Sequence, residues 1–396
     1  MAPFPAPDFA SPQFKANPYP LYARLRAEAP VYRRTRAVFW HVSHVTRYDD
    51  VLRVLKDERL SKEWAGVVPW PLLRLLRPIA RNMLSLDPPD HTRLRGLVNK
   101  AFTPRLVDGL RGRVQQVCDE LLETGTHDGQ MDLVRSYALP IPLTIIADLL
   151  GIPSQDRARF YAWSKSLVAG FFTIEVVPAL PALWRFHRYL RELFARRRAD
   201  PQDDLISALV QAEEAGDMLS EQELSAMVIM LLIAGYETTV HLIASGALAL
   251  LQNPEQAEGL RQNPALADSA VEELLRFTSP LDFATPRVAR EDLTVGTATI
   301  PRGDIVLAIL GSANRDESQF PNPETLDITR EPNRHLAFGI GGHFCLGAPL
   351  ARLEGQIALP TLLRRFPTLR LAAPAETLRW RRNLFLRGLE ELPVYV

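Results

Sequence analysis

The 396-residue sequence predicts a mainly α-helical (α+β) protein with a few small β-sheets. A capping box at Ser220–Glu223 begins a helix of about thirty residues, or about 45 Å, that Asn253 and Pro254 end. Amphipathic stretches elsewhere predict further helices. Stretches with the β-branched and aromatic pattern of strands are few, short and scattered. Helix therefore dominates the predicted fold.

The other elements are predicted from the same local patterns. Besides the long helix, helices are expected over residues 21–29, 48–56, onward from His91 to about Ile152, within 155–198 around Pro178 and Pro181, and over 268–277 and 348–365. Strands are expected as hairpins over 31–45 and 293–309, as a single strand over 281–288, and within 378–396. Breaks are expected at Pro140 and Pro142, and residues 1–16 are expected to form an irregular arm.

Composition describes an ordinary soluble globular protein, with 47% hydrophobic and 23% charged residues. Because 46 basic residues balance 46 acidic ones, there is no global case for nucleic acid or an anionic membrane as partner. Only Cys118 and Cys345 are present, so no disulfide framework is implied and a reducing cytoplasm fits. The N-terminus lacks the positive region and apolar run of a signal peptide.

The long helix is apolar nearly all round, which predicts a buried helix that crosses the protein. A transmembrane helix is disfavoured because Glu237 and His241 lie at its centre. The run 234–239 (Ala-Gly-Tyr-Glu-Thr-Thr) is a poor helix sequence, and such faults tend to mark function or strain. Its small residues permit close approach of a ligand, and Thr238 beside an acid can relay protons. Glu237 and His241 are spaced to share a metal ion, but two ligands are weak support for a metal site.

Residues 338–347 set Cys345 in a glycine-rich loop just ahead of the predicted helix over 348–365. A helix N-terminus favours the thiolate, and the glycines leave room for a flat, bulky group. Cys345 is interpretable as a buried structural cysteine, as a nucleophile paired with a histidine such as His343, or as a thiolate ligand of haem iron. A phosphate-binding loop is disfavoured, because Phe344 stands where a third glycine is needed. The loop alone does not decide between these interpretations.

An ordered set of motifs resembles the cytochrome P450 family, and specifically its soluble bacterial members. Residues 338–347 match the haem-loop pattern Phe-Gly-x-Gly-x-His-x-Cys-x-Gly at every fixed position, and 234–239 resembles the oxygen-activation motif of the central helix. Glu273–Arg276 matches the Glu-x-x-Arg motif, and 320–330 resembles the segment whose arginine completes its triad. The resemblance implies one P450 domain over 1–396, with the haem between the long central helix and the helix after the cysteine loop.

The resemblance also assigns roles to positions of this sequence. It implies haem b as cofactor, with Cys345 as the iron ligand, and it implies that Glu237 and Thr238 deliver protons during oxygen activation. Positions that bind the haem propionates match His91, Arg95, Arg287 and His343. Positions of the structural triad match Glu273, Arg276 and Arg330.

Substrate-lining segments of the family correspond to apolar, partly aromatic residues here. The positions matched are Val67, Val68, Phe171, Phe172, Ala234, Leu281, Phe283, Leu384 and Phe385, with Trp64 and Trp70 nearby. They imply a sizeable hydrophobic substrate such as a polyketide, macrolide, terpenoid, steroid or fatty acid. Asp282 is the one acid among them, and it suits either a basic group of the substrate or a structural role. His241 departs from the family pattern, and a core polar position is favoured over a role in proton delivery.

The function implied is a monooxygenase that hydroxylates or epoxidises its substrate with O2. Two electrons are expected from NAD(P)H through a ferredoxin and its reductase, docking near Cys345 where Arg93, Lys100 and Arg352 supply positive charge. An H2O2-dependent peroxygenase is disfavoured by the Glu237–Thr238 pair, and a non-catalytic haem sensor leaves the proton relay without a purpose. A cytoplasmic monomer without membrane insertion or nucleic acid is expected. Substrate identity and the particular redox partner are not fixed by these residues.

Overall fold

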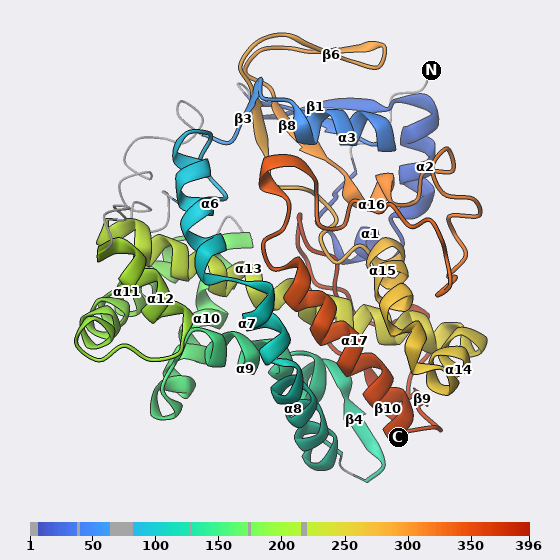
Figure 1. Cartoon of the computed structure of the whole chain (residues 1–396). Coiled ribbons are helices and arrows are strands. Elements are labelled where there is room, and N and C mark those ends of the chain that lie inside the picture. Colours follow the sequence, from blue (N-terminus) through green and yellow to red (C-terminus); the bar gives the residue numbers. More distant parts are fainter. Residues whose placement is uncertain (1–6, 38–39, 64–81, 127, 173–175, 215–219) are drawn as a thin grey trace. The chain divides into compact units, whose positions relative to one another are not determined.

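The computed structural model describes residues 7–37, 40–63, 82–126, 128–172, 176–214 and 220–396 (Figure 1). The chain forms two compact units. Unit 1 comprises Met1–Ser61, Val114–Pro140 and Thr238–Val396, and unit 2 comprises Lys62–Arg113 and Ile141–Glu237. Helices α8 (Arg111–Thr124), α9 (Pro140–Leu149) and α13 (Glu221–Gln252) each begin in one unit and end in the other. The single domain over residues 1–396 that the resemblance implies stays a prediction.

Unit 1 contains a five-stranded sheet in the order β1-β2-β8-β5-β3. Its strands are β1 (Val31–Ala37), β2 (Trp40–Val45), β8 (Ile305–Ala308), β5 (Arg287–Ala289) and β3 (Leu60–Ser61). β2 and β8 pair in parallel, whereas the other pairs are antiparallel. The hairpin predicted over 31–45 is confirmed as β1 and β2. Helix α3 (Tyr48–Lys56) packs on the sheet, and its Val51 and Leu55 join Val45 and Val306 in the core.

The hairpin predicted over 293–309 has its turn at a different place from the one expected near Pro301. Gly296, at φ +59°, reverses the chain between β6 (Leu293–Val295) and β7 (Ala298–Ile300), which pair only with each other. The chain then enters the five-stranded sheet as β8. The strand predicted over 281–288 is also shorter than expected, because β5 covers only its end and the remainder makes isolated bridges at Leu281 and Phe283.

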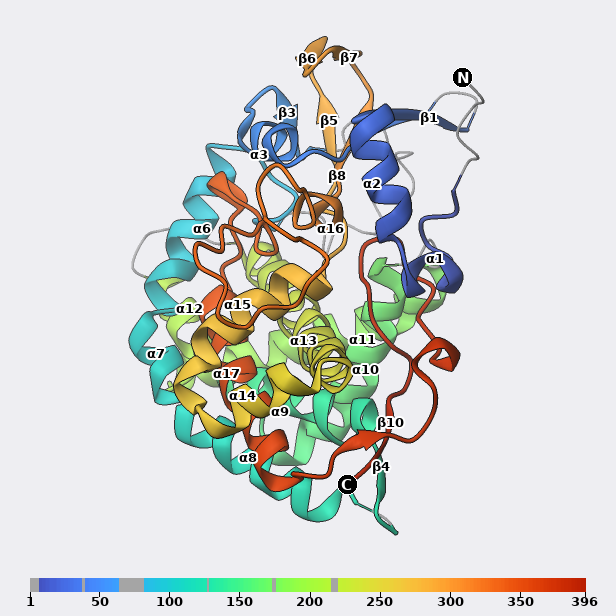
Figure 2. The ribbon, with the colours of Figure 1, turned by 90° about the vertical axis from the view of Figure 1, so that its right-hand side faces the viewer.

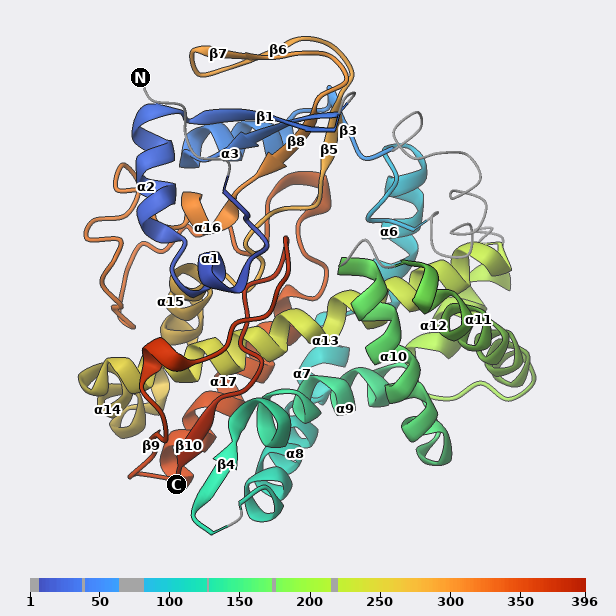
Figure 3. The same ribbon diagram turned by 180° about the vertical axis from the view of Figure 1, so that it is seen from behind.

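The helices predicted in unit 1 are confirmed to within a few residues. They are α2 (Tyr19–Glu28), α3, α15 (Ala267–Thr278) and α17 (Ala348–Arg365), joined by α14 (Pro254–Gln262) and α16 (Leu310–Ala313), which lies beside α2 (Figure 2). The arm predicted to be irregular contains helix α1 (Pro12–Ala16), because Ser11 accepts a hydrogen bond from the Phe14 N–H and Pro12 occupies the first turn. A π-helical turn (Val134–Ala138) follows β4 (Gln130–Asp132), and β4 pairs with β10 (Pro393–Tyr395), which also pairs with β9 (Arg370–Leu371) (Figure 3).

Unit 2 is helical. Its helices are α6 (Asp90–Ala101), α7 (Pro104–Gly109), α10 (Arg157–Phe172), α11 (Val176–Ala199) and α12 (Leu205–Glu214), together with most of α9 and the first half of α13. The break predicted at Pro140 is confirmed, because the π-helical turn ends at Ala138 and α9 begins at Pro140. The break predicted at Pro142 is wrong, because Pro142 lies in the first turn of α9, where backbone N–H groups need no partner within the helix. Pro181 lies inside α11 without ending it.

Helix α13 begins with the predicted capping box. The Ser220 N–H donates to Glu223 Oε2 at 2.9 Å, and the Glu223 N–H donates back to Ser220 Oγ at 3.2 Å. Among the described residues it is the one helix long and apolar enough to cross a membrane, and 78% of its most apolar stretch is buried within the protein. The prediction of a buried core helix is confirmed.

The His241 ring of α13 occupies the space where a side chain of residue 388 would begin. A Cβ atom at Gly388 would lie 1.9 Å from His241 Nδ1, so only glycine fits there. Burial, together with the charges of Arg381 and Lys15, lowers the pKa of His241 to about 3, and the ring is therefore neutral. This burial agrees with the expected role of His241 as a core polar residue.

Replacing Gly388 with alanine should lower the free energy of unfolding by about 1–3 kcal/mol, because the new methyl group overlaps the buried His241 ring. Urea denaturation measures this change. Gly112→Ala is the matched control, since no atom lies within 4 Å of its Cβ position. Adding His241→Ala to Gly388→Ala should recover part of the loss, and a strictly additive double variant would contradict the contact.

Candidate active site

Cys345 lies in unit 1, two residues before Gly347, which caps the N-terminus of α17. The Cys345 N–H donates to the Phe338 carbonyl at 2.9 Å and closes the loop. Gly339 (φ +66°) and Gly341 (φ +79°) adopt left-handed conformations that favour glycine. The loop therefore holds a half-buried sulfur near the positive end of an 18-residue helix, a position that stabilises a thiolate.

The glycines of this loop also explain its close packing. A Cβ atom at Gly341 would lie 3.4 Å from the Leu55 carbonyl of α3, and one at Gly347 would lie 4.0 Å from Cys345 Sγ. The space beside the sulfur is thus free of a side chain from residue 347. Phe344, which precedes the cysteine, is exposed.

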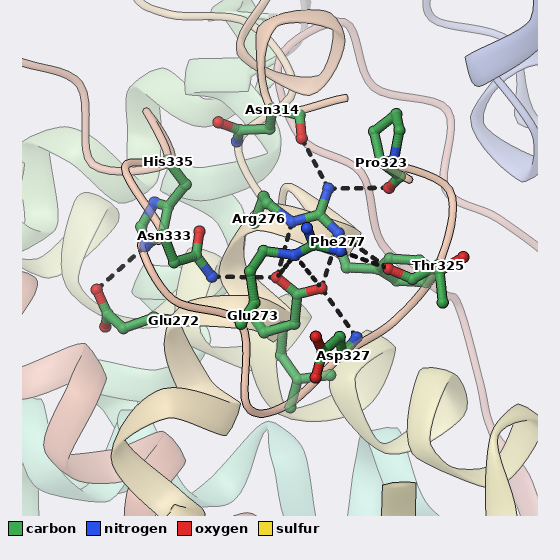
Figure 4. A network of polar contacts seen from close by, with 12 residues as sticks. Glu272, Glu273, Arg276, Phe277, Asn314, Pro323, Thr325, Asp327, Asn333 and His335 are labelled. Atoms are coloured by element: carbon green, nitrogen blue, oxygen red, sulfur yellow. Dashed lines mark hydrogen bonds and ion pairs between the residues drawn. The ribbon is translucent and has the colours of Figure 1, made fainter. Parts of the chain in front are cut away.

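The three residues of the predicted triad contact one another in unit 1, and Figure 4 shows Glu273 and Arg276 at the centre of a network of polar contacts. Glu273 and Arg276 of α15 form a two-point ion pair, with 2.7 Å from Nε to Oε2 and 2.7 Å from Nη2 to Oε1, and both side chains are 0% exposed. Arg330 Nε lies 3.1 Å from Glu273 Oε2, and the Asn333 amide donates to the same oxygen at 3.0 Å. Arg276 also donates to the backbone carbonyls of Asn314, Pro323 and Thr325. These bonds fix the coil that leads into the cysteine loop.

A second ion pair, which the sequence analysis did not find, ties α15 to α17. Arg352 of α17 donates to Glu272 Oε1 at 2.7 Å and to Oε2 at 2.8 Å, and its guanidinium lies 4.6 Å from the Phe338 ring centre. His335 Nε2 lies 3.2 Å from Glu272 Oε2. Arg352 is one of the residues predicted to supply positive charge for an electron donor, but in the structure its guanidinium is ion-paired with Glu272. No local pattern could reveal this pair, because its members lie 80 residues apart.

Arg287 and His343, both predicted to bind propionates, lie in unit 1 with Cys345. Arg287 is buried on β5, and His343 ends the 3₁₀ turn before the cysteine. His91 and Arg95 lie in unit 2 on α6. The two residues are four apart on α6 and therefore share one face of the helix, as predicted. Burial first, and then the charge of Arg95, lowers the pKa of His91.

The middle of α13 carries the predicted acid–alcohol pair on an uninterrupted helix. Glu237 is buried and Thr238 is half-buried. Ala234, one turn before Thr238, is exposed although most of its neighbours on α13 are buried. One face of this buried helix is therefore accessible at the residues that the resemblance assigns to oxygen chemistry.

The predicted substrate segments meet in unit 1. The Asp282 N–H donates to the Phe385 carbonyl at 2.8 Å, and Leu281 bridges Leu386. Leu281, Phe385 and the neighbouring Leu384 are half-buried. Phe283 differs from the prediction: it is 0% exposed and its ring packs edge-on against Phe9 at 5.5 Å, so it supports the segment instead of lining a cavity. Asp282 is structural, since it is 0% exposed and ion-paired with Lys15.

Part of the predicted substrate set lies outside the described residues. This holds for Trp64, Val67, Val68 and Trp70, and for the side chains of Phe171 and Phe172, whose backbone ends α10.

These residues fit haem b. In unit 1, a thiol at a helix N-terminus suits iron, the buried guanidinium of Arg287 suits a carboxylate, and the side-chain-free position at Gly347 suits a flat group. In unit 2, the buried His91 ring can donate a hydrogen bond to a carboxylate, and Ala234 leaves one face of α13 accessible. Within the described ranges, no group of three His, Cys, Asp or Glu residues is arranged to hold a metal ion. Glu237 and His241 therefore have no third ligand of these types among those residues.

Comparisons with known proteins agree with this geometry. A family model described as Cytochrome P450 matches residues 32–380. The chain is 45% identical over 393 residues to the polyketide biosynthesis cytochrome P450 PksS of Bacillus subtilis, covering 96% of each. The solved structure of PksS matches with a TM-score of 0.92 at 44% identity, covering 98% of each chain. The chain is also 45% identical to the vitamin D(3) 25-hydroxylase of Pseudonocardia autotrophica (98% and 96% covered) and 44% identical to the mycinamicin IV hydroxylase/epoxidase of Micromonospora griseorubida (94% of each).

The pair between Glu272 and Arg352 should make stability depend on pH. Burial alone raises the pKa of Glu272, but hydrogen bonds from Arg352 and His335 outweigh burial and bring the pKa to about 2. This value lies below the value of about 4.3 in an unfolded chain. The stabilisation is therefore complete above about pH 4.3 and is lost as the pH falls towards 2.

Glu272→Gln should therefore unfold more easily than the unchanged protein by on the order of 2 kcal/mol at neutral pH, with the difference shrinking below about pH 4.3. Urea denaturation at a series of pH values measures it. Glu376→Gln, at an exposed position, is the control. A difference that is independent of pH would show that the carboxylate charge of Glu272 is not what stabilises the fold.

Proposed function

Because the chain belongs to the cytochrome P450 family, we propose that it hydroxylates or epoxidises a hydrophobic small molecule of the polyketide or macrolide, terpenoid, steroid or fatty-acid type. It is a monooxygenase of that family, and its cofactor is haem b. The observation that carries the substrate proposal is near full-length identity of 44–45% to relatives named for polyketide biosynthesis, for vitamin D(3) and for mycinamicin IV.

Cys345 is the proposed iron ligand. The N-terminus of α17 stabilises its thiolate, and the Phe338 carbonyl and Glu273–Arg276 pair hold the loop in place. Haem b, when bound, supplies the activation of O2 and the transfer of one oxygen atom to the substrate. The residues proposed to hold the two propionates are His91, Arg95, Arg287 and His343.

Glu237 and Thr238 are the proposed proton relay. We propose that Thr238 Oγ1 holds a proton for the chemistry at the haem and that Glu237 replaces that proton; the half-buried Thr238 and the buried Glu237 beside it on α13 support this assignment. The exposed Ala234 one turn earlier leaves room for substrate on the same face. Leu281, Leu384 and Phe385 would provide apolar contacts that orient the substrate and exclude water.

The proposed electron donors are a ferredoxin and its reductase. With two cysteines, the chain cannot bind an iron–sulfur cluster through four thiolates of its own. Arg93 pairs with Glu223 at 2.6 Å and Arg352 pairs with Glu272, so neither offers an unshared charge for docking. Exposed Phe344 beside Cys345 marks the face of unit 1 where we propose that the donor docks.

The substrate proposal is tested with a macrolactone, a secosteroid and a long-chain fatty acid. We expect at least one of them to shift the haem spin state on binding and to gain one oxygen atom when NADPH, ferredoxin and reductase are present. If none binds, the substrate class is wrong. Product formation with H2O2 alone, and none with the reductase system, would instead identify a peroxygenase.

The relay is tested by Thr238→Ala, which removes the hydroxyl from α13. The rate of product formation should fall by about 10²-fold, the contribution typical of positioned proton transfer, while NADPH oxidation continues and yields H2O2. Thr239→Ala is the matched control, because Thr239 is the buried neighbour on the same helix. Equal coupling of NADPH oxidation to product in both variants would rule out the relay.

A further inference from the structure

A fully buried ion pair joins the N-terminal helix α1 to the loop after α15. Lys15 Nζ lies 2.6 Å from Asp282 Oδ2, and both side chains are 0% exposed. The same ammonium donates to the Leu384 carbonyl at 3.0 Å. Lys15 therefore contacts both segments of unit 1 that are proposed to line the substrate pocket, 281–284 and 384–385.

These two segments are also bonded to each other. The N–H groups of Asp282 and Phe283 donate to the Phe385 carbonyl at 2.8 and 3.3 Å. The Phe385 carbonyl is thus bonded to the first segment. The peptide unit between Leu384 and Phe385 is held on both sides, because its carbonyl accepts from Lys15 and its N–H donates to Asn383 Oδ1 at 2.9 Å. Because peptide units are planar, these bonds fix the Phe385 Cα between two held units and one side of the Leu384 Cα.

The Asp282 carboxylate is held independently of Lys15. The Tyr22 hydroxyl lies 2.9 Å from each of its oxygens. A Cβ atom at Gly311 would lie 2.3 Å from Asp282 Oδ1, so the carboxylate fills the space that glycine leaves. Asp282 is therefore a fixed anchor against which the ammonium of Lys15 is positioned.

The N-terminal arm is fastened to the C-terminal segment at further points. Arg387 donates from Nε to the Lys15 carbonyl at 2.8 Å and from Nη2 to the Ala16 carbonyl at 3.2 Å. The Asn383 N–H donates to the Ala10 carbonyl at 3.1 Å. Figures 2 and 3 both show α1 beside the red coil of the C-terminal segment. These hydrogen bonds thus fix the position of helix α1 relative to residues 383–387.

A buried ion pair is a weak source of stability, because the loss of hydration offsets the attraction between the charges. A packed apolar pair of similar volume stabilises a fold about as well. An apolar pair cannot donate to a backbone carbonyl, however, and Lys15 does so at Leu384. The feature of Lys15 that packing alone does not explain is this control of a backbone direction.

We propose that Lys15 is a positioning residue for the substrate, whose ammonium sets the orientation of Leu384 and Phe385 through the Leu384 carbonyl. The inference rests on the proposed function, because it concerns the same pocket. It assigns a part in substrate selection to the N-terminal arm, whose buried lysine does not touch the substrate.

The test compares two double variants of the haem-loaded protein. Lys15→Met with Asp282→Asn removes both charges and the donor to Leu384, and leaves no buried charge without its partner. Lys15→Gln with Asp282→Asn makes the same charge change but keeps an N–H donor. Arg24→Met with Glu28→Gln, at the exposed ion pair of α2, is the control for charge removal near this site.

The readout is the affinity for imidazole and for 4-phenylimidazole, both of which bind haem iron. Only 4-phenylimidazole carries a phenyl substituent that extends into the substrate pocket. Its affinity therefore reports the shape of the pocket even if the proposed substrate class is wrong. We expect the Met/Asn variant to change its 4-phenylimidazole affinity by about fivefold or more, with imidazole affinity within about twofold. The Gln/Asn and control variants should match the unchanged protein, and regioisomer ratios should shift only in the Met/Asn variant.

Equal 4-phenylimidazole affinities in the Met/Asn and Gln/Asn variants would overturn the proposal. Loss of haem from the Met/Asn variant, alone or together with the Gln/Asn variant, would also overturn it, because Lys15 would then serve folding. If no member of the substrate panel binds the unchanged protein while the azole affinities diverge as expected, the substrate class fails and the role of Lys15 stands.

Discussion

The buried ion pair between Glu273 and Arg276 is the contact on which the cysteine loop depends. Neither side chain reaches solvent, and such a pair persists only when the remaining donors and acceptors are also bonded. Arg276 meets this condition by donating to carbonyls of the coil, and Glu273 by accepting from Arg330, Asn333 and the Asp327 N–H. This coil forms no helix or strand, so these side-chain bonds take the place of the backbone hydrogen bonds that a helix or sheet would provide. Removing one partner leaves a buried charge, at a cost of about 3–5 kcal/mol.

Two adjacent glutamates of α15 thereby hold the loop from both ends. Glu273 fixes the coil that approaches Cys345, whereas Glu272 fixes α17, which leaves it, through Arg352. Arg352 also stacks on Phe338, the residue whose carbonyl accepts from the Cys345 N–H. The position of the sulfur is thus set by charged contacts around a glycine-rich backbone that has little stiffness of its own.

Local signals in the sequence predict the elements well where a physical rule acts over a few residues. The capping box at Ser220 and the predicted helix over 348–365 are examples, and the motif residues Glu273, Arg276 and Arg330 do meet. Two predictions fail for local reasons. Pro142 lies in the first turn of α9 instead of breaking a helix, and Gly296 makes the turn expected near Pro301. The pairs of Lys15 with Asp282 and of Arg352 with Glu272 leave no local pattern, because 267 and 80 residues separate their members.

The same arrangement of contacts appears twice in unit 1. A buried or half-buried carboxylate, on α15 or just after it, binds a cation from a distant segment. That cation then contacts a backbone carbonyl or an aromatic ring. At Glu272 the distant cation is Arg352, which contacts the Phe338 ring at the start of the cysteine loop. At Asp282 it is Lys15, which donates to the Leu384 carbonyl of a segment proposed to face the substrate. Phe283, fully buried behind those segments, belongs to this support and not to the lining. On the proposed role of Lys15, substrate selection also depends on residues that do not touch the substrate. A substitution at Lys15 or Tyr22 then changes the contacts that support Leu384 and Phe385 while both of these residues stay the same.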